Sequence, residues 1–283
     1  MSKKTSKKLA RAKNFTRLKT GVIKVAGEFS NLIEPWSKAD IPDFLSAVDH
    51  SLAITDKDEY EKALKKEETD FNLLVRQLGE AKKSLAIVLQ GRDGAGKTGA
   101  TMRITEALGY DFKIFASVPI GPPSEEELQH YYMWRFGKHE RMPAFGQVRV
   151  FDRSWQERVL VERVMGYTPE AQIRDSYAEL RVAEWQMKRQ GIVLVKIWLD
   201  ISKGEQKVRF KARKKDKPWK VSASDAIARA HWDDYTPAAN EMFQRTGSDF
   251  APQFIISSED KRYSRVTVLR VINQQMREAL SKK

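Results

Sequence analysis

The segment GRDGAGKT, residues 91–98, has the residue types and spacing of a phosphate-binding loop. Its glycines allow the backbone to turn sharply and to bring N–H groups close to phosphate oxygens. Lys97 is expected to reach the terminal phosphates, and the Thr98 hydroxyl is expected to bind Mg²⁺. An apolar run precedes the loop and a helical pattern follows it, so the helix N-terminus would add partial positive charge. The predicted phosphate-binding residues of this loop are Gly91, Arg92, Gly94, Ala95, Gly96, Lys97 and Thr98.

Two carboxylates are placed where they could organise a divalent cation beside those phosphates. Asp93 lies inside the loop, where bound phosphate would repel a carboxylate unless a metal ion intervened. Asp152 directly follows the apolar run 147–151, and ligand clefts in parallel sheets lie at the carboxyl ends of the strands. We therefore predict a Mg²⁺ site, with Mn²⁺ as the alternative ion, formed by Asp93, Asp152 and Thr98. The competing interpretation makes Asp93 a turn residue that hydrogen-bonds within the loop.

Charged residues after Asp152 could act on a transferring phosphoryl group. Arginine side chains such as Arg153 and Arg158 neutralise developing charge and fix the geometry of phosphate oxygens. Glu162 follows Arg158 by four residues, so an ordinary ion pair on one helix face is the alternative for these two. The predicted catalytic residues are Asp93, Lys97, Asp152, Arg153, Arg158 and Glu162.

The segment 207–220, KVRFKARKKDKPWK, carries eight basic residues and one acidic residue. In small-molecule P-loop kinases, a basic helical lid closes over the phosphates and excludes water. We predict such a lid at about 203–220, and a solvated helix end is the alternative. The basic residues could also follow a long polyanion.

The pattern of apolar runs predicts an α/β fold with a five-stranded parallel sheet covered by helices on both faces. The strands are expected at 84–90, 112–118, 147–151, 191–199 and 253–257. The helices are expected at 97–108, 124–139, 170–190, 203–215, 222–245 and 261–281. We predict a basic, mobile arm at 1–20 and one domain at 21–283, which begins with a helical preface at about 38–82.

Composition excludes several classes of protein. The 283 residues include no cysteine, so disulfides, thiolate metal sites and cysteine nucleophiles are excluded. No apolar run approaches the roughly 20 residues that span a bilayer, and we expect a cytoplasmic protein without a membrane partner. The net charge of +13 favours polyanionic partners or serves solubility alone.

Five segments together resemble the polyphosphate kinase 2 family, in order over about residues 50–280: GRDGAGKTGA, FDRSWQERVLVERVMG, FKARKKDKPWK, WDDYTPAANEMFQRT and EDKRYSRVTVLRVI. The resemblance implies a fold like thymidylate kinase with a lid. It implies reversible, Mg²⁺-dependent transfer between inorganic polyphosphate and a nucleoside mono- or diphosphate, AMP to ADP or ADP to ATP, in a homodimer or homotetramer. Its site residues fall on Asp93, Lys97, Asp152, Arg153, Arg158 and Glu162, and its lid residues on Arg209, Lys211, Arg213 and Lys220.

The chain departs from the family pattern at two site positions. Gln156 stands where the family often has tyrosine, and Thr98 stands where it often has glycine. The segments 122–136 and 158–164 are most similar to the members that phosphorylate AMP, whereas the length is equally similar to those that phosphorylate ADP. AMP is therefore the expected acceptor, with ADP and guanine nucleotides as alternatives.

Two other functions share the same P-loop. An ATP-dependent nucleotide kinase would have the same loop and lid, and the charge of the lid does not exclude ATP as donor. A nucleic-acid-binding P-loop ATPase would suit the net charge. We do not expect nucleic acid as a partner, because the sequence contains no known nucleic-acid module and no series of aromatic residues spaced for single strands.

Overall fold

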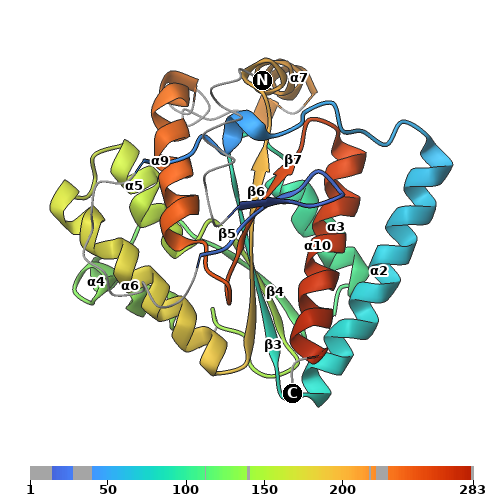
Figure 1. The fold of residues 1–283 in the computed structure, drawn as a ribbon, viewed down its shortest axis with the longest axis horizontal. Helices are drawn as coiled ribbons and strands as arrows, with labels where there is room; N and C mark the ends of the chain where they lie inside the picture. Colours follow the sequence, from blue (N-terminus) through green and yellow to red (C-terminus); the bar gives the residue numbers. More distant parts are fainter. Residues whose placement is uncertain are drawn as a thin grey trace.

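A computed structural model describes residues 15–27, 40–111, 113–138, 141–216, 218–220 and 229–281 of the chain. It contains a central sheet with helices on both faces (Figure 1). The five expected strands are β3 (Ser84–Gly91), β4 (Phe115–Pro119), β5 (Val148–Asp152), β6 (Ile192–Asp200) and β7 (Gln253–Ser257). They are parallel to one another, in the order β7-β6-β3-β5-β4. The fold is therefore α/β, as predicted.

The predicted number of strands was too low by two. Strands β1 (Phe15–Arg17) and β2 (Ile23–Val25) extend the sheet beyond β7, and both pairings are antiparallel. Three-residue strands give no clear alternation in the sequence, and their pairing depends on the distant strand β7. Residues 15–20, which we assigned to a mobile arm, thus form β1 and the turn that follows it. Residues 1–14 lie outside the described part of the chain.

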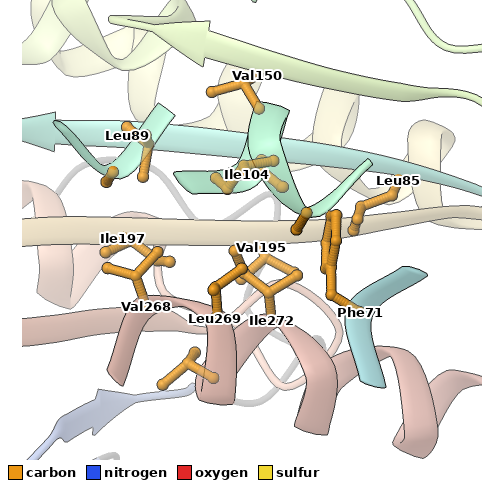
Figure 2. Close-up of a cluster of buried hydrophobic side chains, with 14 of the residues drawn as sticks. Phe71, Leu85, Leu89, Ile104, Val150, Val195, Ile197, Val268, Leu269 and Ile272 are labelled. Atoms are coloured by element: carbon orange, nitrogen blue, oxygen red, sulfur yellow. The ribbon is translucent and has the colours of Figure 1, made fainter. Parts of the chain in front are cut away.

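Two helical layers cover the sheet because the side chains of each strand alternate between its faces. On β3, Leu85, Ile87 and Leu89 contact one layer, formed by α2 (Lys57–Glu80), α3 (Lys97–Ala107) and α10 (Lys261–Ser281). Figure 2 shows this cluster, with side chains of α10 packed against those of the strands. Ala86 and Val88 contact the other layer, which includes α6 (Glu170–Arg189) and α9 (Trp232–Thr246).

The helical preface consists mainly of α2. Its N-terminus is capped by Asp56, whose side chain accepts a hydrogen bond from the backbone N–H of Glu59. Before it, residues Leu45–Ala47 form a single 3-10 turn, η2. Residues 28–39, which include the first part of the predicted preface, lie outside the described residues. No helix in the described ranges is long and apolar enough to cross a membrane.

One predicted helix is interrupted. Residues 124–139 form two short pieces, α4 (Glu125–Leu128) and the 3-10 helix η3 (Tyr132–Phe136). Ser124 and Glu127 form a capping box at the start of α4, and the Glu127 carboxylate is buried against Arg135 and Arg141. Burying this carboxylate between arginines from later in the chain requires the backbone to bend, so tertiary contacts override the helical pattern.

The remaining elements follow the ends of β5 and β6 in the sequence. They are η4 (Trp155–Val159), α5 (Val161–Val164), α7 (Lys203–Asp216) and η5 (Pro218–Lys220). The predicted helix 222–245 begins in residues outside the described ranges, and its described part is α9.

A buried ion pair joins the sheet to the second helical layer. Lys196, at the centre of β6, is fully buried with its Nζ atom 2.6 Å from the Glu184 carboxylate of α6. Nζ also donates to the Thr246 carbonyl at 2.7 Å, and the Trp155 indole donates to Glu184 at 2.9 Å. Burial raises the pKa of Glu184 and lowers that of Lys196, and their mutual attraction opposes both shifts. Every polar contact of the pair therefore matters, because neither charge can reach water.

We predict that Lys196→Met lowers the free energy of unfolding by about 3–5 kcal/mol, because it leaves the Glu184 carboxylate buried without a cation. Urea unfolding followed by circular dichroism measures the loss. The double variant Lys196→Met with Glu184→Gln should recover much of it, since no buried charge remains. A single variant as stable as the wild type would contradict this account of the pair.

Candidate functional site

The loop between β3 and α3 turns sharply at glycines with positive φ. β3 ends at Gly91 with φ of 141°, a conformation that L side chains rarely adopt, and an added Cβ would lie 2.4 Å from the Leu199 carbonyl oxygen. The loop then turns through Gly94, whose φ is 85°, and α3 begins at Lys97. Glycine is thus required where the loop leaves the sheet against β6. The loop is compact and ends at a helix N-terminus, where anions are favoured.

The Lys97 side chain reaches back across the loop to Gly91. Its Nζ donates to the Gly91 carbonyl at 2.8 Å and lies 3.8 Å from the nearer carboxylate oxygen of Asp93. The side chain is largely buried and lines the cleft in front of the loop. This position places an ammonium group among the backbone groups that a phosphate would approach, as the sequence predicts.

Neighbouring segments hold the loop in place, which the sequence did not reveal. Arg209 of α7 donates to the Gly94 carbonyl at 2.9 Å and, through its other terminal nitrogen, to the carbonyls of Ser258 and Glu259. Gln206 of α7 donates to the Asp93 carbonyl at 2.8 Å. Ser258 donates to the Ala95 carbonyl at 2.6 Å. The carbonyl oxygens of Asp93, Gly94 and Ala95 are thereby held by side chains.

Arg209 therefore has a different placement from the one its motif suggests. Its Nε also donates to Glu205 at 2.7 Å, so all three nitrogens of the buried guanidinium donate hydrogen bonds within the protein. The other predicted lid residues differ in where their side chains lie. Arg213 lines the cleft, whereas Lys211 is exposed, and the side chain of Lys220 lies outside the described part of the chain.

Arg92 points away from the cleft. Its guanidinium stacks on the Trp232 ring at 3.7 Å, and it donates to the Trp232 carbonyl and to the Thr236 hydroxyl. Burial lowers the pKa of this side chain. The predicted phosphate-binding role of Arg92 is thereby restricted to its backbone, and its side chain attaches the loop to α9.

The predicted metal ligands lie in one cleft. Asp152 ends β5 opposite Leu89 of β3 in the parallel register, so both strands end at the same edge of the sheet. A cleft of about 800 Å³ is lined by Asp93, Thr98 and Asp152, together with Lys97, Arg153 and Arg213. Within the described ranges, no group of three or more His, Cys, Asp or Glu side chains could hold a metal ion. Two carboxylates and a hydroxyl suit Mg²⁺, which usually takes its remaining ligands from phosphate oxygens and water.

Arg153 lies at the junction of two clefts with a strained backbone. Its φ of 68° is in the left-handed region, which is unfavourable for a residue with a side chain. Its backbone N–H donates to the Leu89 carbonyl at 3.3 Å, so the strain is held by the edge of the sheet. We call the cleft of about 800 Å³ in front of the P-loop the phosphate cleft. Arg153, Asp93 and Ile120 line both this cleft and a second cleft.

The second cleft, of about 720 Å³, is rich in aromatic side chains, and we call it the aromatic cleft. The sequence did not identify this cleft, because its walls come from segments far apart in the chain. Exposed Tyr131 and Tyr167 lie at its surface. Burial raises the pKa of Tyr235 to about 12, so its hydroxyl stays protonated near neutral pH. Its aromatic and proline lining residues are Pro122, Pro123, His130, Tyr131, Tyr132, Tyr167 and Tyr235.

Arg158 and Glu162 lie in this second cleft and not beside the P-loop. They form the ion pair that we considered as the alternative, with 3.0 Å between their nearest charged atoms. Both also bond to the Thr168 hydroxyl, and Arg158 stacks on Tyr132 at 3.9 Å. Arg158 is thus held rigidly in the cleft wall.

Glu157 is a further charged residue that the sequence did not single out. It lies in η4, and its buried carboxylate accepts a hydrogen bond from the Gln90 amide at 3.1 Å. Burial raises its pKa, and nearby Arg153 and Lys97 oppose this shift. It lines the second cleft. Its hydrogen bond with Gln90 links the segment after β5 to the end of β3, just before the P-loop.

Five parallel strands, a glycine-rich loop between β3 and α3, and a carboxylate at the end of β5 are typical of P-loop phosphotransferases. The chain matches the family model of polyphosphate kinase 2 over residues 54–283, and it therefore belongs to this family. The resemblance seen in the sequence is confirmed.

Three comparisons describe its relatives. The chain is 41% identical over 229 residues to a polyphosphate:AMP phosphotransferase of Pseudomonas aeruginosa, covering 80% of this chain and 45% of that one. It is 37% identical over 190 residues to an ADP-polyphosphate phosphotransferase 2 of Rhizobium meliloti, covering 66% and 61%. A crystal structure of polyphosphate kinase 2 from Arthrobacter aurescens has a TM-score of 0.76 at 30% identity and covers 89% and 91%. The chain spans about half the length of the first curated relatives that it matches.

An ion pair between His50 and Asp200 supports the edge of the sheet beside the P-loop. His50 Nε2 lies 3.0 Å from the buried Asp200 carboxylate, and this hydrogen bond raises the pKa of His50. The stabilisation should be complete below the ordinary pKa of histidine and should be lost as pH rises through the raised value. We predict that His50→Gln lowers the urea midpoint more at about pH 5.5 than at about pH 8.5.

Asp200→Asn provides the control for this prediction. In that background, the effect of His50→Gln on the urea midpoint should differ less between the two pH values, because the largest cause of the raised pKa of His50 is absent. Equal effects of His50→Gln at both pH values in the wild-type background would contradict an ionic role for this pair.

Lys97 provides a test of the phosphate site alone. We predict that Lys97→Met weakens binding of tripolyphosphate by about 10- to 100-fold, since a charge-assisted hydrogen bond contributes about 1.5–3 kcal/mol. Isothermal titration calorimetry measures the affinity, and circular dichroism checks the fold. Lys65→Met, at an exposed position of α2, is the matched control. Unchanged affinity in a folded Lys97→Met protein would refute this assignment of the site.

Proposed function

We propose that this protein transfers a phosphoryl group between inorganic polyphosphate and a nucleotide, with AMP as the preferred acceptor and ADP or a guanine nucleotide as alternatives. The observation that carries the proposal is the meeting of two chemically different clefts at Asp93 and Arg153. The name of the Pseudomonas aeruginosa relative supports both substrates.

The phosphate cleft suits the polyphosphate chain. Its lining includes the P-loop, Lys97, Arg213 and Lys261, so it presents cations and backbone N–H groups to a linear polyanion. The aromatic cleft suits the nucleotide, because tyrosine rings can pack against a base and its polar rim can bind the ribose. In this arrangement the acceptor phosphate meets the end of the polyphosphate chain at the junction.

The reaction exchanges one phosphorus–oxygen bond for another. An oxygen of the AMP phosphate forms a bond to the terminal phosphorus of polyphosphate, and the bridging bond to the next phosphate breaks. The products are ADP and a chain one residue shorter. Lys97 and Arg153 would offset the charge that develops on the transferred group. The acceptor phosphate is ionised near neutral pH, so the reaction needs no strong base.

A divalent cation belongs to this proposal. Asp93, Asp152 and Thr98 would hold Mg²⁺, or Mn²⁺ as the alternative, with phosphate oxygens as further ligands. The ion would supply charge neutralisation at the phosphates, while Asp93 also orients the loop through its contact with Lys97.

The proposal has three further features, of which the first two come from the family resemblance and the third from composition. The first is a closing lid like that of thymidylate kinase, built on α7, which would exclude water from the phosphates. The second is assembly into a homodimer or homotetramer. The third is a cytoplasmic location, which suits a chain without cysteine because that compartment is reducing.

The test is an end-point assay that offers AMP, ADP, GMP and GDP separately with long-chain polyphosphate and Mg²⁺. We expect ADP from AMP, no product without polyphosphate, and no product in excess chelator until Mg²⁺ is restored. Lys97→Met should lower the rate by about a hundredfold or more, as expected for a group that stabilises transition-state charge. Turnover with ATP but not with polyphosphate would instead indicate an ATP-dependent nucleotide kinase.

A further inference from the structure

Helix α7 has two faces with opposite surroundings. Its cleft-facing side chains are Glu205, Val208, Arg209, Ala212, Arg213 and Asp216. On this side, Arg209 is bonded to Glu205 and to the P-loop, so the cationic charge is partly neutralised and fixed. The opposite side carries the lysines Lys203, Lys207, Lys211 and Lys214, all of them exposed.

These four lysines form a continuous row. At about 100° per residue they fall within an arc of about 80° on the helix, centred opposite the cleft-facing side chains. The row extends about 16 Å along the helix axis, from Lys203 to Lys214. We call it the outer lysine face. Figure 1 shows α7 beyond the end of β6.

Most of this charge has no anionic partner within the described ranges. Lys203 lies 3.2 Å from Asp233 of α9, but no carboxylate lies within 4 Å of Lys207, Lys211 or Lys214 among the described side chains. Lys207 and Lys211 are a like-charged pair four residues apart, which is unfavourable for an isolated helix. The helix C-terminus would favour Lys214 but not the other two. Local helix energetics therefore do not account for the row.

The outer lysine face is also hollowed. Lys203, Gly204, Gln206 and Lys207 line a depression whose other wall includes Arg229 and Ala230. No acidic residue contributes to its described lining. Cations that converge on a depression concentrate positive potential more strongly than cations scattered on a convex surface.

We propose that the outer lysine face binds the part of a long polyphosphate chain that extends beyond the P-loop cleft. This inference rests on the proposed function and deepens it, because it separates a site for the reacting end from a site for the distal chain. One side of the phosphate cleft is lined by α7, so a chain that leaves the cleft on that side passes the edge of this helix. The outer lysine face lies on the other side of that helix and offers unneutralised cations in a line.

A polyphosphate chain fits this face better than a nucleic acid strand does. Single-stranded nucleic acid is usually held by a basic groove combined with a series of aromatic rings on which bases stack. The arc from Lys203 to Lys214 contains no aromatic side chain, and Phe210 is turned toward the P-loop near Gly94. Trp219, exposed beyond the helix, is a single ring rather than a series.

The test compares binding of long and short chains. The triple variant Lys207→Gln, Lys211→Gln and Lys214→Gln keeps good helix formers at all three positions. Its affinity for labelled long-chain polyphosphate should fall by about tenfold at moderate salt, and the slope of log affinity against log salt should become shallower by about two. Its affinity for tripolyphosphate, which fits within the cleft, should stay the same.

The matched control replaces Lys57, Lys62 and Lys65 of α2 by glutamine, which removes the same charge from another exposed helix. Equal losses in both triple variants would show a net-charge effect and overturn the proposal. Equal loss for long and short chains in the α7 variant would overturn it too, and so would single-stranded RNA binding this face more tightly than polyphosphate.

Binding and turnover are measured separately. A wild type that binds the long chain without transferring phosphate would contradict the proposed function, whereas equal binding by wild type and the α7 variant would contradict the outer site.

Discussion

The parallel pairing of β3 with both β5 and β6 determines where the functional side chains lie. Leu89 is opposite Asp152, and Gly91 is opposite Leu199, so three strands reach the same edge of the sheet within a few residues of one another. A shift of one residue would turn every side chain to the opposite face, where it would meet the wrong helical layer, so packing on both faces fixes this register. The P-loop, the strand-end carboxylate and the strained Arg153 all follow from that register.

Helix α7, in the segment that we predicted as a lid, supports the P-loop. Arg209 and Gln206 bind carbonyl oxygens of the loop, and Ser258 binds another from the opposite side. Fixing the carbonyl groups in this way holds the loop in one conformation. A basic motif in a lid thus contains residues with different tasks, since Arg209 is buried and bonded while Arg213 faces the cleft.

The two clefts differ in the source of their walls. The phosphate cleft is built from the P-loop and the start of α3, the ends of β4 and β5, and helix α7. The aromatic cleft is built from short helices and turns between Gly121 and Thr168, together with Tyr235. Buried ion pairs hold this irregular wall, in particular Glu127 with Arg135 and Arg141. Residues Asp93 and Arg153 belong to both clefts, which makes the junction the natural place for chemistry.

The sequence determined the P-loop, its flanking strand and helix, the five parallel strands, and the family. These signals are local: glycine spacing, apolar runs and short motifs depend on neighbouring residues and therefore survive without knowledge of the fold. It also placed Asp152 at the correct edge, since a carboxylate after a buried parallel strand has only one edge to occupy.

Only the tertiary structure decided the remaining features. Strands β1 and β2 form because β7 offers an edge for pairing, and the interrupted segment 124–139 bends because Glu127 is buried against two arginines. The side chain of Arg92 turns to Trp232, and Arg158 pairs with Glu162 in the aromatic cleft, although both arginines stand in phosphate-site motifs. The direction of a long charged side chain depends on which partners lie near it in space, and for Arg92 those partners, Trp232 and Thr236, are distant in the sequence. Residue types and spacing therefore identify a loop that can bind phosphate, whereas packing decides which cations actually face it.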